Sequence, residues 1–388
     1  MKNRLLFLIF ATFFAASVLG NSSVDNTDFH SLVINNYSFL PSKLNKEERE
    51  AKSKAMDSFW SIVSADRVKY LPKLREELNR KDNPIFFYYD GAKLLLSLSN
   101  EIKDKQLAVA SIARTDLSEV QSADYVRTIM KLGAEGIDTS GAAFRILDYP
   151  TFTVQAPVHA LTLGQNYSLI LMLYRLPEQQ FLGKSINRLL SEKNITSQKS
   201  LLEVLWYSVT PIGDETITKI SKDKIIAQEV RDFAVKLLEN TNQINAMPAS
   251  AIEKIRQQIN LEQTLLEVGP ILAMKNKEKQ MSKTQIDTFK RFLKALRESE
   301  EKGTMEMLKS FAKNSDRSLP QEISEYAEEL IKNKEKSVPL VPRSLSQNDV
   351  AELKKVRQNF LISISDEAFE DFTKTTMLIR WAQKNGNR

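Results

Sequence analysis

The side chains that most often act as acid–base catalysts are scarce in this sequence of 388 residues, which contains two histidines and no cysteine. His159, in the apolar segment APVHALTLGQNYSLILMLY, is a candidate general base beside Tyr167 or Asp148. A histidine within an apolar helical layer, hydrogen-bonded to a neighbour, explains the same pattern and is favoured, because no orienting partner can be identified. The HExxH, GxSxG, Walker, GxGxxG and EF-hand patterns are also missing from the sequence. We therefore expect no cofactor, no metal site and no catalytic residue.

Aspartates near the expected helix ends, together with nearby aromatic residues, form the second candidate constellation. Two carboxylates about 5 to 10 Å apart are sufficient for glycoside hydrolysis, a reaction known on all-helical toroids, and aromatic rings can stack on sugars. The aspartates are Asp66, Asp90, Asp138, Asp148 and Asp214, and the aromatic residues are Trp60, Tyr88, Tyr89 and Trp206. Helix capping and core packing explain the same residues, and no spacing connects two of these carboxylates. A glycan-active enzyme is therefore the alternative and not the leading hypothesis.

The stretch Asn83 to Ser99, NPIFFYYDGAKLLLSLS, fits either a hairpin turning at Asp-Gly or a helix that opens at Pro84. The helix is favoured because Asn83 suits an N-cap, Pro84 suits the first helical position, and apolar residues recur at helical spacing. A helix through Gly91 suggests that a neighbouring backbone approaches closely there. It also places Asp90 in a buried or groove-facing position, where it needs a partner such as Arg127 or Lys93.

Helical periodicity dominates after residue 45, so the expected fold class is all-α. Apolar segments come in pairs whose starts, near residues 84, 122, 157 and 197, are about 35 to 40 residues apart, as in helical repeat arrays. Beyond residue 245 the expected helices are more charged, among them 249–260 and 263–275, with a break or kink at Gly269-Pro270. The expected divisions are a polar, extended or poorly ordered arm at 21–44, a helical-repeat domain at 45–244, a charged helical region at 245–336, a proline-containing linker at 337–344 and a helical hairpin at 345–388.

The first twenty residues have the pattern of a secretory signal peptide. Lys2 and Arg4 precede an apolar run, and Val18-Leu19-Gly20 fits a cleavage site before Asn21. The run is shorter than the roughly 20 residues of a membrane anchor. A cysteine-free exported chain suits a bacterial periplasm better than a eukaryotic extracellular space, although secretion is an alternative. The net charge of +6 is spread over mixed-sign segments and does not indicate nucleic-acid binding.

Residues 197–240, SQKSLLEVLWYSVTPIGDETITKISKDKIIAQEVRDFAVKLLEN, resemble a HEAT-type repeat. A leucine-rich helix is followed by a Gly213-Asp214 connector, a short second helix and then Val230-Arg231. In HEAT repeats the valine packs inward, while the arginine and a nearby aspartate interact between successive repeats. The resemblance therefore implies a right-handed α-solenoid, with structural roles between repeats for Asp214, Val230 and Arg231.

HEAT-type arrays usually serve as binding scaffolds, and this resemblance gives the leading hypothesis for function. We expect an exported, non-enzymatic helical-repeat protein that binds a protein or peptide. A structural factor of the cell envelope is a further alternative. The candidate binding residues are Tyr88, Tyr89, Asp90, Trp60, His159 and Trp206.

Overall fold

The computed structural model of the protein is all-α, as the periodicity predicts. Its described part contains eighteen α-helices, two 3-10 turns and one pair of two-residue strands. The structure describes residues 28–39, 43–149, 152, 154–155, 162–163, 165–274, 281–299, 301–313, 319–334, 345, 347–361 and 366–386. The expected signal peptide and the linker at 337–344 lie outside these residues. Among the described helices, none combines the length and the apolar character that a membrane span requires.

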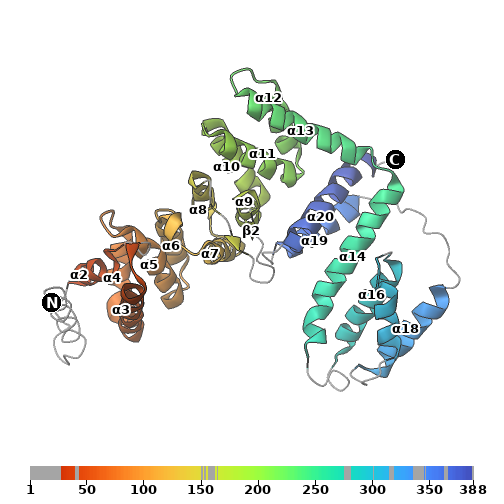
Figure 1. Cartoon of the computed structure of the whole chain (residues 1–388), viewed down its shortest axis with the longest axis horizontal. Coiled ribbons are helices and arrows are strands. Elements are labelled where there is room, and N and C mark those ends of the chain that lie inside the picture. Colours follow the sequence, from red (N-terminus) through yellow and green to blue (C-terminus); the bar gives the residue numbers. More distant parts are fainter. Residues whose placement is uncertain are drawn as a thin grey trace. The chain divides into compact units, whose positions relative to one another are not determined.

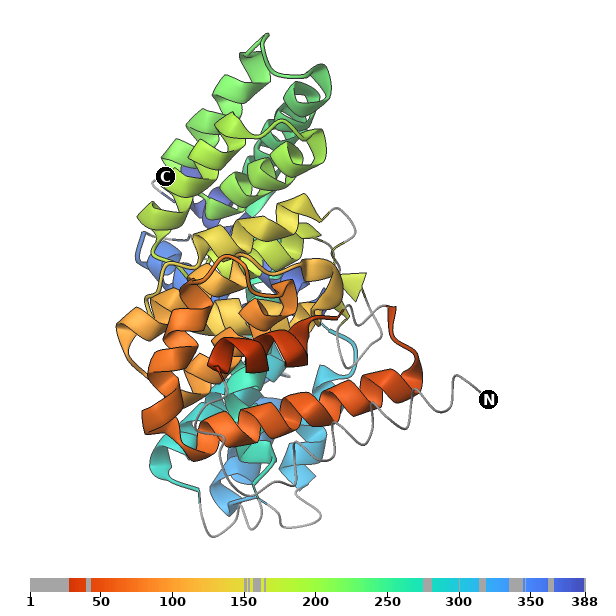
Figure 2. The ribbon, with the colours of Figure 1, turned by 90° about the vertical axis from the view of Figure 1, so that its left-hand side faces the viewer.

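The chain divides into two compact units, Met1–Val120 and Gln121–Arg388. This boundary falls inside the segment 45–244, for which the sequence predicts one domain. The first unit contains helices α2 to α6, of which α4, α5 and α6 pack on one another, and Figure 2 shows the shorter α2 beside the long orange helix α3. The bounds are α2 Phe29–Tyr37, α3 Lys46–Ala65, α4 Arg67–Asn79, α5 Ile85–Leu98 and α6 Ile102–Ile112, followed by the 3-10 turn η3 Leu117–Glu119.

Helix α2 corrects the expectation of an extended arm at residues 21–44. Phe29, Val33 and Tyr37 recur every four residues, so they lie on one face of the helix, and all three are buried. The Asp28 side chain caps the helix by accepting a hydrogen bond from the His30 amide. A short apolar stripe within a polar segment is therefore sufficient to form a helix when a partner surface covers it.

Helix α5 settles the two interpretations of the stretch 83–99, because a single helix continues through Asp90 and Gly91. Its N-cap is Pro84 and not Asn83, whose buried side-chain amide instead donates to the carbonyl and the carboxylate of Glu77. A Cβ atom on Gly91 would lie 3.0 Å from side-chain atoms of Leu78 and of Phe87. The close approach predicted at Gly91 is therefore made by buried side chains and not by a neighbouring backbone.

The second unit begins with smaller helices that pack largely on their neighbours in sequence. A short antiparallel pair of strands connects residues 154–155 to 162–163, where the sequence segment TFTVQ alternates. The bounds are α7 Ser122–Ala134, α8 Ser140–Arg145, η4 Ile146–Asp148, β1 Val154–Gln155, β2 Thr162–Leu163, α9 Gln165–Leu173, α10 Glu178–Ser191, α11 Ile195–Ser208, α12 Pro211–Lys222 and α13 Gln228–Asn245.

The remaining helices of the second unit pack around the long helix α14. Helices α16, α17 and α18 form a core with the end of α14, built on buried residues such as Phe289, Phe292 and Ile323. The hairpin of α19 and α20 lies beside α14, and α20 also packs against α13 (Figure 1). The bounds are α14 Ala249–Leu272, α16 Lys283–Glu298, α17 Thr304–Lys313, α18 Gln321–Lys334, α19 Gln347–Phe360 and α20 Asp366–Asn385.

The predicted interruption of α14 is wrong, because residues 249–272 form one helix. Pro270 lies in its last turn, so the hydrogen bond that proline removes is lost only two residues before the helix ends. Leu261, Thr264, Val268 and Ile271 follow helical spacing and are all buried, which keeps the C-terminal half of α14 against its neighbours.

Candidate functional site

An open cavity of about 410 Å³ lies along one face of α3 in the first unit, and we call it the α3 groove. Helix α3 begins with a capping box, in which the side chains of Asn45 and Glu48 each accept a hydrogen bond from the other's backbone amide. Helical spacing then places six of the lining residues on one face of α3. The lining consists of Phe39, Leu44, Arg49, Lys52, Ser53, Met56, Asp57, Trp60 and Asp90.

Two of the predicted binding residues, Trp60 and Asp90, meet in this groove. Trp60 is half-buried, and its indole N–H donates to the Tyr37 hydroxyl at 3.3 Å, which fixes the ring against α2. Burial, together with the negative charge of Asp90, raises the pKa of Tyr37 well above its usual range. Tyr37 therefore remains a neutral hydroxyl beneath the groove.

The amine of Lys52 lies at the Phe39 side of the α3 groove. Its Nζ is 5.0 Å from the centre of the Phe39 ring and donates to the Asn35 carbonyl at 3.3 Å. Burial lowers the pKa of Lys52, because the amine has lost part of its hydration. Apolar surface, a partly desolvated cation and a carboxylate therefore share one groove, and this combination can bind a peptide side chain with charged flanks.

Tyr88 and Tyr89 have structural positions and do not line the α3 groove. Both are buried. The Tyr88 hydroxyl donates to the Arg80 carbonyl at 2.8 Å, and the guanidinium of Arg114 lies 4.2 Å from the centre of its ring. The Tyr89 ring is 5.7 Å from the Lys93 amine. The Tyr88 hydroxyl and both rings are thus engaged by residues of the same unit.

Of the two histidines, His30 lies within the described residues. His159 lies outside the described residues. His30 lies in α2, and its Nδ1 is 2.9 Å from a carboxylate oxygen of the buried Glu77. Among the described residues, no group of three or more histidine, aspartate or glutamate side chains has the arrangement of a metal site.

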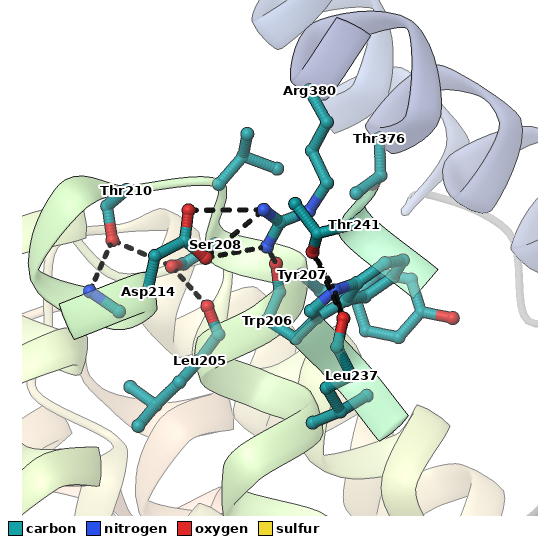
Figure 3. Close-up of polar contacts among 12 residues, drawn as sticks. Leu205, Trp206, Tyr207, Ser208, Thr210, Asp214, Leu237, Thr241, Thr376 and Arg380 are labelled. Atoms are coloured by element: carbon teal, nitrogen blue, oxygen red, sulfur yellow. Dashed lines mark hydrogen bonds and ion pairs between the residues drawn. The ribbon is translucent and has the colours of Figure 1, made fainter. Parts of the chain in front are cut away.

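Trp206 belongs to a cluster that joins α11, α12 and α13 to the C-terminal helix α20 (Figure 3). Its indole N–H donates to the Leu237 carbonyl at 3.1 Å and to the Thr241 hydroxyl at 2.9 Å. The guanidinium of Arg380 lies 4.7 Å from the centre of the Trp206 ring. Trp206 is therefore a buried structural residue and offers no open ring face to a ligand.

Arg380 forms the central interaction of this cluster. Both of its terminal nitrogens donate to Asp214 at 3.1 to 3.2 Å, and Nη2 also donates to the Trp206 carbonyl (Figure 3). The Arg380 side chain is 2% exposed, whereas that of Asp214 is 40% exposed. The carboxylate is thus hydrated and lies in the first turn of α12, where the helix dipole also favours a negative charge.

The connector between α11 and α12 brings both Arg380 acceptors, Asp214 and the Trp206 carbonyl, to one place. Val209 ends α11 in the left-handed conformation, with a φ of 53°, which is unfavourable for a β-branched residue. Thr210 then caps α12 by accepting a hydrogen bond from the Gly213 amide. A Cβ atom on Gly213 would lie 2.7 Å from the Leu205 carbonyl oxygen, so only glycine allows α11 and α12 to approach this closely.

A second buried arginine, Arg357 of α19, contacts the same helices. Its Nη1 donates to the Tyr207 carbonyl at 2.8 Å, and its guanidinium lies 5.5 Å and 5.4 Å from the ring centres of Tyr174 and Phe372. Burial lowers the pKa of Arg357. No described carboxylate forms an ion pair with it, so aromatic faces and carbonyl oxygens replace its hydration.

Val230 and Arg231, the other two residues of the repeat-like signature, lie in α13. Val230 is fully buried. Arg231 donates to the Ile226 carbonyl at 2.8 Å and to the Gln228 side chain, both at the start of its own helix. Asp214 pairs with Arg380, whereas Arg231 bonds to residues at the start of α13. These two residues of the signature therefore have separate partners.

Carboxylates gather at the contact between α14 and α20. Burial of Asp371, with Glu262 as the next contributor, raises the pKa of Asp371 to about 7. Glu370 and Glu301 contribute to this increase in the pKa, whereas the Lys374 amine, 3.9 Å away, opposes it. Asp371 therefore titrates near neutral pH within this contact.

A second open cavity, of about 420 Å³, lies in the second unit and is lined in part by Gly133, Arg175 and Gln358. Burial lowers the pKa of Arg175, and no described residue forms an ion pair with it. The arginine lies at the C-terminal ends of α7 and α9, where helix dipoles favour a cation. A structural role at these helix ends is therefore sufficient to explain Arg175.

Sequence reasoning identified Trp60 and Asp90 in the groove and Trp206 and Asp214 in the cluster, but it missed the basic residues of both sites. The signal for the α3 groove was present, because Arg49, Lys52, Met56 and Trp60 recur at intervals of three and four residues on a predicted helix. Arg380 was visible as a charge within the apolar run TTMLIRW, where a buried cation requires a partner. Its partner Asp214 lies 166 residues away, and no local pattern identifies such a pair.

Comparisons with protein-family models, with curated proteins and with solved structures find no match to this chain.

Proposed function

We propose that this protein is an exported, non-enzymatic helical scaffold that binds a segment of another protein or a peptide in the α3 groove. One observation carries the proposal: an open groove of about 410 Å³ combines apolar and aromatic walls with charged residues of both signs. Grooves between helices commonly accept apolar side chains of a peptide. Export rests on the signal-like first twenty residues, and the periplasm is the compartment that the lack of cysteine favours.

The helical array is part of the same proposal. Helices α10 to α13 pack successively, and α11 contacts both α12 and α13, which supports a HEAT-like stack. The full burial of Val230 also agrees with the inward valine of such repeats. In this proposal the second unit is the supporting array, and the first unit carries the groove that binds the partner.

The test is selection from a library of displayed random peptides with the purified protein. We expect enriched peptides to share an apolar or aromatic residue, and we expect Met56→Glu to abolish their binding because it places a charge in the groove wall. Lys54→Glu is the matched control, since Lys54 is an exposed residue of α3 outside the groove lining. Failure to enrich a common motif, or unchanged binding to the Met56→Glu variant, would reject the proposal.

One observation favours a second candidate, a glycan-active site. Asp57 and Asp90 line the same cavity as Trp60, so two carboxylates and a stacking ring share one groove. A glycan hydrolase predicts that the protein releases reducing ends from purified peptidoglycan and that both Asp57→Asn and Asp90→Asn abolish this release. Absence of release by the unmodified protein would leave peptide binding as the function of the groove.

A further inference from the structure

The charged residues of the α3 groove are ordered by sign along the helix. Arg49 and Lys52 lie in the first two turns, the half-buried Met56 follows, and Asp57 comes after it. Asp90, from α5, also lines the groove, and Trp60, one turn after Asp57, donates its indole N–H to the Tyr37 hydroxyl. The groove therefore has a basic end and an acidic end, with an apolar wall between them.

Three of these charges, those of Arg49, Lys52 and Asp57, form no ion pair with any residue that the structure describes. Arg49 donates to the Asn45 carbonyl at 3.5 Å, and Lys52 contacts a carbonyl and an aromatic ring. No carboxylate among the described residues offsets the loss of hydration that lowers the pKa of Lys52. An anionic group arriving at this end would therefore find a partly desolvated cation.

The length of the groove limits the occupant. With a rise of about 1.5 Å per residue, Lys52 and Arg49 lie about 8 and 12 Å along the axis from Asp57. An extended peptide advances about 3.3 Å per residue, so this distance corresponds to two to four residues. A short peptide segment can thus contact both charged ends while one central side chain packs on Met56.

We propose that the α3 groove selects a peptide segment with a central apolar residue, an acidic residue on the Lys52 side and a basic residue two to four positions away on the Asp57 side. This inference rests on the proposed function and names the chemistry of the partner. The apolar anchor supplies contact area, and the two charges fix the direction in which the segment lies.

The experiment compares two fluorescein-labelled peptides by fluorescence anisotropy with the purified protein. One contains glutamate, leucine, phenylalanine and lysine in that order between glycines, and the other has glutamine in place of both charged residues. We expect the charged peptide to bind about fivefold more tightly, since each exposed ion pair contributes a factor of about two to five. We also expect this advantage to disappear at high salt.

Two variants assign the effect to the two ends. Lys52→Gln and Asp57→Asn should each weaken binding of the charged peptide about two- to fivefold more than binding of the neutral peptide. Lys54→Gln and Glu50→Gln are the matched controls, because both residues are exposed on α3 and lie outside the groove lining. Equal affinities for the two peptides, or an equal loss in the controls, would overturn the proposal.

The outcomes also separate this inference from the proposed function. If the neutral peptide binds as tightly as the charged one and Met56→Glu removes both, peptide binding stands and the charge selection fails. If neither peptide responds to Met56→Glu, the groove does not bind peptides and both fail. If a synthetic peptide of residues 21–28 competes as well as the charged peptide, the occupant is a segment of the same chain, and the proposed partner is rejected.

Discussion

The unequal burial of Asp214 and Arg380 predicts that two destabilising substitutions will partly correct each other. Asp214→Ala removes the carboxylate and leaves a cation whose side chain is 2% exposed without its counter-ion. Arg380→Met removes the cation but keeps an apolar chain of similar shape against Trp206. The remaining carboxylate is 40% exposed and stays hydrated, so its loss of a partner has little consequence.

The magnitudes follow from the contacts. Removing one partner of a buried ion pair costs about 3 to 5 kcal/mol when a charge is left buried, and this range applies to Asp214→Ala. Arg380→Met loses the stacking on Trp206, about 1 kcal/mol, and leaves the Trp206 carbonyl without this donor, about 1 to 2 kcal/mol. The double variant leaves no buried charge, so we expect it to be more stable than Asp214→Ala alone by about 1 to 2 kcal/mol.

Urea unfolding followed by tryptophan fluorescence measures this difference. The protein contains three tryptophans, and in a Trp60→Phe background the signal comes from Trp206 and Trp381, both of which lie at the packing of α20. Lys354→Met is the control, because Lys354 and Glu178 form an exposed ion pair whose loss should cost less than about 1 kcal/mol. The reasoning is refuted if the double variant is less stable than Asp214→Ala or if the two single effects simply add.

Three further predictions concern other parts of the fold. Gly91→Ala should lower the free energy of unfolding by about 1 kcal/mol, because the fully buried side chains around Gly91 have no room to move. Gly183→Ala, at a helical position with open space around it, should raise the free energy of unfolding by about 1 kcal/mol, and chemical denaturation measures both changes. Asp371→Asn should stabilise the protein by about 2 kcal/mol at pH 8 and not at pH 3, and unfolding midpoints measured across this pH range test the sign. The reason is that the Asp371 carboxyl keeps its proton up to about pH 7 in the folded state but loses it near pH 4 in the unfolded state. The Arg75 guanidinium is the largest cause that holds the pKa of the buried Asp104 below its usual range. Asp104→Asn should therefore lower the free energy of unfolding by about 2 kcal/mol at pH 7, and this loss of stability should shrink as the pH falls below 4.

Helical periodicity predicted most of the fold because it is a local property. The stretch 83–99 shows this well: apolar spacing and the proline at its start gave a helix in spite of the Asp-Gly pair. The same rule would have found α2, where Phe29, Val33 and Tyr37 are spaced by four, but the polar residues between them obscured the stripe. The helices predicted at 249–260 and 263–275 form one helix, because buried apolar residues such as Leu261 and Val268 continue past the expected gap and Pro270 lies in the last turn.

The candidate site was predictable only in part, because its residues come from different elements. Trp60 and Asp90 are predicted from their chemistry, and they line one groove in a unit where α2 packs on both α3 and α5. Tyr88 and Tyr89 were chosen for the same reason, yet their position on α5 turns them into the core. Residue type alone does not distinguish an aromatic ring that lines a groove from one that fills a core; the direction of the side chain decides, and tertiary packing sets that direction.

The pairing of Asp214 with Arg380 explains how a repeat-like signature can be present while its aspartate has another partner. An aspartate in the first turn of α12 is stabilised by the helix dipole and remains hydrated, so it can accept any cation that packing brings near. The α19–α20 hairpin supplies that cation and also covers Trp206 and Tyr207, whose rings would otherwise be exposed. The weakened docking of the hairpin that we expect for Asp214→Ala should therefore expose the rings of α11 to solvent. Quenching of Trp206 fluorescence by acrylamide, in a background lacking the other two tryptophans, would detect this exposure.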